Sequence, residues 1–108
     1  QLTSSKLGLT TNDIFGKEMI YRYGNFDIHL VIISDSTLYL KNNKTGQDAN
    51  EKMSTIHIDE NTMLASFVDT ENNLVTMLSD FENGKASAFL YKDDGSVTTL
   101  SGSIKLKK

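Results

Sequence analysis

The sequence has no cysteine, no proline and no tryptophan among its 108 residues. Without cysteine the chain forms no disulfide, no thiolate metal site and no cysteine nucleophile, and it is compatible with either redox compartment. No apolar run approaches the roughly 20 residues that a membrane-spanning helix needs. The longest run, residues 30–33, is only as long as part of a strand. We therefore expect no membrane span.

Neither sign of charge predominates, because 11 basic and 14 acidic residues give a formal net charge of only -3. The basic residues form no stripe that could follow a phosphate backbone, which argues against a nucleic-acid partner. The one basic cluster, Lys105, Lys107 and Lys108, is typical of a solubilising tail or a guarded edge strand. The chain begins at Gln1 rather than at methionine, which favours removal of a preceding segment by a signal peptidase or by design. An exported location, periplasmic or secreted, and a cytoplasmic one both stay open.

What the chain does contain is a regular succession of short segments and turn signals. Residues 17–23, for example, alternate in polarity and place Tyr21 and Tyr23 on one side. Asn83-Gly84 supplies the positive backbone φ that a short hairpin loop demands. The predicted strands are residues 17–23, 26–34, 37–41, 52–58, 62–68, 74–81, 85–91 and 96–107.

Eight antiparallel strands with short connections favour an all-β, eight-stranded up-and-down barrel, because closing the sheet removes both unpaired edges. A Greek-key sandwich is the alternative. The polar residues 42–50 predict a mobile loop. Residues 1–15 predict an irregular or short helical lid, with Thr11 or Asn12 as a candidate N-cap. The length suits a single domain, with the barrel over residues 16–107.

The order of these segments resembles the MoaF-like family of small lipocalin-type (calycin) barrels. Gly16-Lys17 opens the first strand, and an aromatic residue follows in that strand. Residues 65–89, ASFVDTENNLVTMLSDFENGKASAF, are similar to the family's strand, acidic hairpin, strand, Asp-Phe-x-Asn-Gly turn and returning strand. Residues 94–96 begin the last hairpin arm, and LSGSI at 100–104 resembles the closing strand. The resemblance implies a lipocalin-type fold.

The resemblance implies less about activity. Phe67 stands where many relatives carry tryptophan. The relatives include phenolic acid decarboxylase-like barrels, and their catalytic residues have no counterpart that we can assign in this chain. No catalytic residue follows from the family.

Candidate binding residues are those on the barrel walls. An eight-stranded barrel is wide enough for one small ligand or for its own side chains. A buried tyrosine hydroxyl needs a polar partner, which a ligand can supply. His29 shares its strand face with Val31 and Ile33, so that face is a candidate cavity wall. Asp80 either contacts a ligand at the rim or fixes the following turn. The predicted ligand-binding residues are Tyr21, Tyr23, His29, Tyr39, Phe67, Asp80, Phe89 and Tyr91.

Metal or nucleophilic chemistry has little support. His29 and His57 with Asp27 or Asp80 have the residue types of a facial metal triad, but the sequence has no His-x-His pair and no third histidine. No serine lies in a Gly-x-Ser-x-Gly context. We therefore expect no metal and no cofactor.

Three functions remain open. The first is non-enzymatic binding of a small apolar or aromatic molecule in the barrel interior or mouth, by a monomer or homodimer. The second is a protein-interaction module that uses an outer face or loop 42–50. The third is acid–base catalysis of isomerase or lyase type by a barrel histidine or by Asp80. The barrel fold and the Tyr, Met and Leu content of the strands favour the first.

Overall fold

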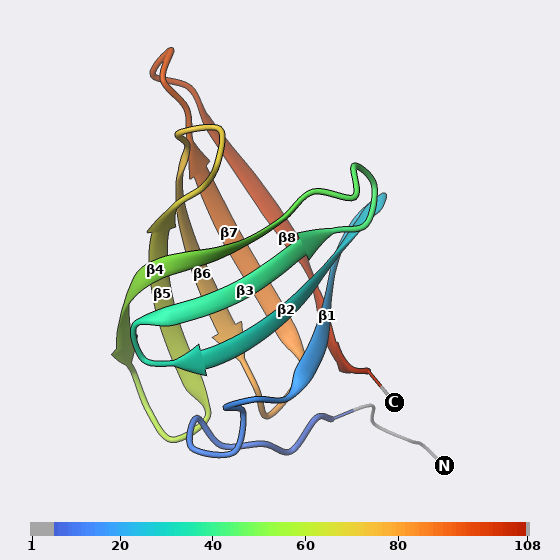
Figure 1. Ribbon diagram of the computed structural model, residues 1–108. Coiled ribbons are helices and arrows are strands. Elements are labelled where there is room, and N and C mark those ends of the chain that lie inside the picture. The colour runs from blue at the N-terminus through green and yellow to red at the C-terminus, as the bar shows by residue number, and fades with distance from the viewer. Residues whose placement is uncertain (1–5, 108) are drawn as a thin grey trace.

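The computed structural model describes residues 6–107, which form a closed barrel of eight antiparallel strands (Figure 1). Each strand pairs with the next in the chain, and the last pairs with the first. The predicted fold class is confirmed, and the sandwich alternative is wrong because the sheet is continuous. The strands are β1 (Glu18–Tyr23), β2 (Phe26–Ser34), β3 (Thr37–Asn42), β4 (Asp48–His57), β5 (Thr62–Val68), β6 (Leu74–Asp80), β7 (Lys85–Tyr91) and β8 (Val97–Leu106).

Closure depends on a glycine at the seam between β1 and β8. Four residue pairs join these strands, from Met19 opposite Leu106 to Arg22 opposite Ser103. A Cβ atom on Gly102 would lie 1.8 Å from the backbone oxygen of Arg22. The close approach of the two backbones therefore requires a residue without a side chain at this position.

The strand boundaries match the sequence prediction to within one residue, except at the start of β4. The strand starts at Asp48 rather than at residue 52, so the predicted loop 42–50 is in fact shorter. Residues 48–52 pair with β3 despite their polarity, because backbone pairing needs no apolar side chain. On its other side, β4 pairs with β5 only from Met53 opposite Phe67 onward. The first half of β4 therefore lacks the β5 ladder on that side.

The N-terminal segment lies across one end of the barrel, below the strands in Figure 1. Leu9 N–H donates to the carbonyl of Phe81, and Thr11 N–H donates to the carbonyl of Glu60. Ile14 is fully buried against the same end. Residues 6–16 contain no helix, so the segment is irregular and the predicted N-cap role of Thr11 or Asn12 is wrong. The chain instead bonds to the turns that it covers. Residues 1–5 and Lys108, which belong to the predicted lid and basic cluster, lie outside the described residues.

The covered half of the barrel is filled by its own side chains. In this half the Tyr21 hydroxyl lies 2.8 Å from the Ser79 hydroxyl, and both residues are buried. Close packing of this kind is typical of a protein core. The side chains that fill this half include Ile14, Met19, Tyr21, Ile32, Leu38, Met63, Phe81 and Ile104.

Residues 6–107 contain no helix with the length and apolar character to cross a bilayer.

Candidate functional site

The other half of the barrel is hollow and encloses a cavity of about 500 Å³. It lies at the end that carries the β1–β2, β3–β4 and β5–β6 connections. Small inward residues such as Ala88 help to leave this space, because they contribute little volume to the interior. The apolar lining consists of Tyr23, Phe26, Ile28, Leu30, Leu40, Ala49, Phe67, Val75, Met77, Ala88, Leu90 and Leu100.

Alternation along each strand decides which residues reach the cavity. In β7, Ala88 and Leu90 face inward, while Phe89 and Tyr91 are each 52% exposed on the outer surface. Side chains of successive strand residues point to opposite faces, so the smaller residues line the cavity and the larger ones face solvent. The inner face of β7 therefore contributes little side-chain volume to the barrel interior.

Among residues 6–107, the Tyr23 hydroxyl is the one buried side-chain polar atom that has no hydrogen-bond partner. Its side chain lines the cavity, the residue is 3% exposed, and its hydroxyl makes no hydrogen bond. Burial raises the pKa of the Tyr23 hydroxyl, so it stays protonated and can donate as well as accept. A buried hydroxyl without a hydrogen-bond partner is unfavourable for the folded state.

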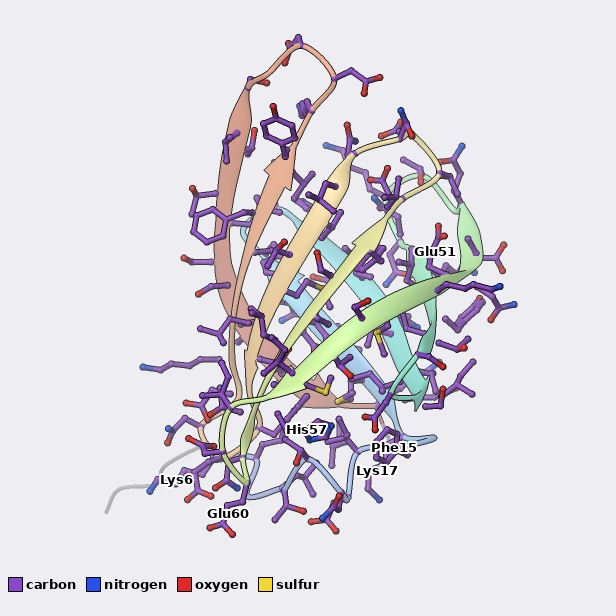
Figure 2. All side chains as sticks on the ribbon, turned by 90° about the vertical axis from the view of Figure 1, so that its left-hand side faces the viewer. Lys6, Phe15, Lys17, Glu51, His57 and Glu60 are labelled. Atoms are coloured by element: carbon purple, nitrogen blue, oxygen red, sulfur yellow. The ribbon has the colours of Figure 1, made fainter. Side chains whose placement is uncertain are left out.

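The rim of the cavity is acidic. Asp48 accepts a hydrogen bond of 2.9 Å from the Tyr39 hydroxyl on the outer side. Asp69 accepts from the backbone N–H groups of Glu71 and Asn73, which fixes the β5–β6 loop. Glu51 is half-buried, and its pKa is raised by desolvation and by the charge of Asp69. Figure 2 shows Glu51 at the half of the molecule opposite to His57 and Glu60.

The structure places few of the sequence-predicted residues at this cavity. Tyr23 and Phe67 line it. Tyr21 faces inward but belongs to the filled half, where its hydroxyl is already bonded to Ser79. Burial raises the pKa of Tyr21, and the Ser79 contact lowers it to a smaller extent. Tyr21 is a core residue in this arrangement.

Four predicted residues face outward instead. His29, Tyr39, Phe89 and Tyr91 are absent from the cavity lining, and each lies on the strand face opposite to lining or buried neighbours. His29 does share its face with Val31 and Ile33 as predicted, but that face is the outer one. The reason is that both faces of β2 are apolar, so the pattern did not reveal which one turns inward.

Asp80 lies at the filled end of the barrel, remote from the cavity lining. Its carboxylate accepts from the backbone N–H groups of Glu82 and Asn83 and from the Asn83 side-chain amide, at 2.9–3.1 Å. These bonds, the Asn83 side chain first, lower the pKa of Asp80. The carboxylate therefore fixes the β6–β7 turn, as the structural alternative for this residue predicted.

Neither histidine reaches the cavity. The His57 Nε2 atom lies 2.8 Å from an Asp35 carboxylate oxygen at the filled end, and His57 is absent from the cavity lining. Within the described part of the chain, no three His, Asp or Glu side chains gather as metal ligands would.

The sequence reasoning missed most of the lining because it favoured large aromatic residues. The signal that was available is the regular alternation of small and apolar residues, such as Ala86, Ala88 and Leu90 in β7. A second available signal was the two acidic segments that form the rim, DANE at 48–51 in the first half of β4 and DTE at 69–71 after β5.

Comparison with known proteins supports the fold and the family. No curated protein matches the chain. A crystal structure of a Burkholderia vietnamiensis protein, described as a candidate beta-lactamase, superimposes with a TM-score of 0.78 at 14% sequence identity. The match covers 88% of this chain and 96% of that one. At this identity the likeness concerns the fold alone. The family model described as MoaF-like matches residues 15–105. The chain therefore belongs to the MoaF-like family, as its turn and strand motifs predicted.

Proposed function

We propose that the protein binds a small, mostly apolar molecule in the open half of its barrel. The observation that carries the proposal is the 500 Å³ cavity above a filled half. Ligand sites are typically clefts of about 300–1,000 Å³ with apolar walls and a few polar groups. This cavity has such walls, with the Tyr23 side chain among them and polar residues at the rim.

The proposal is binding without catalysis. The acid–base alternative required a histidine inside the cavity, and His29 and His57 both lie outside it. Asp80, the other residue on which that alternative rested, is engaged in a turn at the opposite end. The beta-lactamase description belongs to a protein that shares only the fold, so no activity is taken from it.

The test is a titration with phenylnaphthylamine, a neutral dye that fluoresces in apolar surroundings. We expect saturable binding to the wild type. The Ala88→Phe variant places a ring inside the cavity and should abolish binding, whereas Thr99→Phe places the same ring on the exposed outer face and should not. Circular dichroism establishes that both variants are folded. Equal binding by both variants would contradict the proposal.

An outer-face interaction module is the second candidate, and one observation favours it. Leu74, Tyr91 and Val97 are exposed and lie next to one another across β6, β7 and β8. Exposed apolar side chains that adjoin across strands are typical of contact surfaces. Light scattering tests it: a homodimer that dissociates in the double variant Tyr91→Ser/Val97→Ser supports this candidate, and a monomer at all concentrations opposes a homodimer through this face.

A further inference from the structure

We propose that the first half of β8 pairs with the same segment of a second copy of the chain, so that two barrels join edge to edge as an antiparallel dimer. The segment is residues 97–101, and we call it the β8 edge. The inference goes beyond ligand binding, because it does not depend on the cavity, and it concerns a strand edge rather than the outer face of the barrel. It is carried by the open side of this strand and by the contrast with a second open edge in the same barrel.

The β8 edge has no neighbouring strand on one side. β8 pairs with β7 along residues 97–103 but with β1 only along residues 103–106. Figure 1 shows β1 and β8 diverging above the part in which they pair. Within residues 6–107, no strand pairs with residues 97–102 on the β1 side. The sheet is therefore closed at the seam, but the β8 edge is an open strand edge.

The hydrogen-bond pattern shows which backbone groups lie on the open side. Lys92 N–H donates to the carbonyl of Ser96 at the start of the β7–β8 ladder. Because bonded pairs alternate along an antiparallel ladder, the even-numbered residues of β8 bond to β7 and the odd-numbered residues turn their backbone groups away from it. The N–H and C=O groups of Val97, Thr99 and Ser101 therefore form a row with which a further strand can pair.

The composition of the β8 edge does not oppose the approach of another strand. Proteins protect open edges with charged side chains, proline, bulges or a very short strand. The sequence VTTLS contains no charge and no proline, its register with β7 has no bulge, and three of its residues are β-branched, which favours strand pairing. Thr98 and Thr99 point to opposite faces and are both exposed. The edge is therefore accessible from both faces of the sheet.

A second open edge in the same barrel has the opposite composition. Residues 48–52, the β4 edge, pair with β3 but not with β5. Their sequence DANEK places charges at Asp48 and Lys52, and Glu51 points inward among the residues that line the cavity. Charged side chains on an edge, above all an inward-pointing one, disfavour the addition of a strand. The barrel therefore protects the β4 edge, whereas the β8 edge is left able to pair.

A second copy of the β8 edge is a fitting partner for the first. The backbone groups on the open side are centred on Thr99, so a two-fold antiparallel arrangement places Thr99 opposite Thr99 and Val97 opposite Ser101 of the second copy. No like charges meet in these pairs, and each copy supplies the hydrogen-bond partners that the other lacks. Because the contact is the same on both copies, it closes as a dimer and leaves no β8 edge unpaired.

The charges beside the β8 edge also favour this arrangement. The turn at residues 92–96 carries two acidic side chains and one lysine, so its net charge is negative. In the antiparallel dimer each turn lies near the end of β1 of the other copy, where Arg22 pairs with Ser103 of β8. A negative turn beside an arginine is electrostatically complementary, whereas the net charge of -3 disfavours most other approaches of two copies.

The first test is the mass in solution as a function of protein concentration. Sedimentation equilibrium measures it up to about 1 mM, because a single pair of strands buries less area than a standard interface. We expect the mass to rise from 12.0 kDa toward twice that value. Amide hydrogen exchange locates the contact: Val97 and Thr99 should gain protection as the concentration rises, and Asn50 in the β4 edge should not. A monomer at every concentration would overturn the proposal.

A proline variant and a matched control separate the edge from the outer face. Thr99→Pro removes an N–H that pairs with no strand of the same chain, so it should weaken the dimer about tenfold or more while the barrel stays folded by circular dichroism. Tyr91→Ser removes an exposed ring from the outer face of β7 and should leave the dimer unchanged. A dimer that Tyr91→Ser dissociates and Thr99→Pro does not would show pairing through the outer face, and the proposal would be wrong.

A charge exchange tests the two-fold register. Thr99→Lys and Thr99→Glu each place like charges directly opposite one another in the dimer, so each variant alone should be a monomer. Mixing them in equal amounts should restore the dimer, because Lys then lies opposite Glu. Variants that dimerise alone as the wild type does, or a mixture that stays monomeric, would rule out pairing about Thr99. Position 99 does not line the cavity, so the dye should bind all of these variants, and failure of this inference leaves the binding function untouched.

Discussion

The rings of Tyr21 and Tyr23 lie 6.3 Å apart on the inner face of β1, yet their hydroxyls have different surroundings. The Tyr21 hydroxyl is bonded to Ser79, whereas the Tyr23 hydroxyl has no partner within residues 6–107. The boundary between the filled half and the hollow half of the barrel passes between these two side chains. The Tyr21 side chain is therefore part of the filled core, whereas the Tyr23 side chain is part of the cavity lining.

Removal of each hydroxyl should therefore have a different effect on stability. Tyr21→Phe should lower the free energy of unfolding by about 1–2 kcal/mol, because Ser79 is left buried without its partner. Tyr23→Phe should change it by less than about 0.5 kcal/mol or raise it, because no bond is lost. Urea unfolding of the two variants measures both values. Equal losses would show that the two hydroxyls are equally engaged.

The seam between β1 and β8 should not tolerate a side chain at Gly102. Gly102→Val should lower the free energy of unfolding by about 3 kcal/mol or more, because its Cβ would collide with the backbone oxygen of Arg22. Ser101→Val, on the exposed outer face of the same strand, should change it by about 0.5 kcal/mol or less. Thermal unfolding compares the two. A stable Gly102→Val variant would contradict the close approach of the strands.

Asp80 should stabilise the fold in a pH-dependent way. Hydrogen bonds lower its pKa in the folded protein below the ordinary value of 3.8, so its contribution is present above that value and is lost as the pH falls through the folded pKa. Asp80→Asn should be less stable than the wild type by about 1 kcal/mol at neutral pH. The difference should close at acidic pH. A difference that stays constant with pH would rule out the charged carboxylate as its source.

Glu51 should have the opposite effect. Its pKa in the folded protein lies above the ordinary value of 4.5, so ionisation opposes folding once the pH rises through the folded pKa. Glu51→Gln should therefore raise the free energy of unfolding at neutral pH by about 0.5 kcal/mol or less, and the gain should vanish well below pH 4.5. Unfolding curves at several pH values check this. A loss of stability would indicate a favourable contact of the carboxylate within the protein.

The sequence predicted the strands and turns well because their signals are local. Asn83-Gly84 illustrates this, since Gly84 has a positive φ of 68° in the β6–β7 turn. The start of β4 was missed because residues 48–51 are polar, and their strand conformation comes from pairing with β3. That pairing is a tertiary effect which local propensity does not contain.

The site was predicted less well for a physical reason. Alternation shows which residues share a face but not which face turns inward when both are apolar, and His29 was placed on the wrong side for this reason. Large aromatic residues were expected to form the cavity walls, but Phe89 and Tyr91 face solvent while Ala88 faces the cavity. An eight-stranded barrel keeps space for a ligand only where its inward side chains are small enough, so the large size of an aromatic residue does not predict that it lines the cavity.

The most direct test of the account is a methyl NMR titration of the wild type with phenylnaphthylamine. The account predicts saturable shifts for methyl groups that line the cavity, including those of Ala88, Met77 and Leu100, with little change at Ile14 and Met63 in the filled half. Shifts confined to the outer face, at Val97, would contradict it, and so would the absence of any shift at the cavity methyl groups.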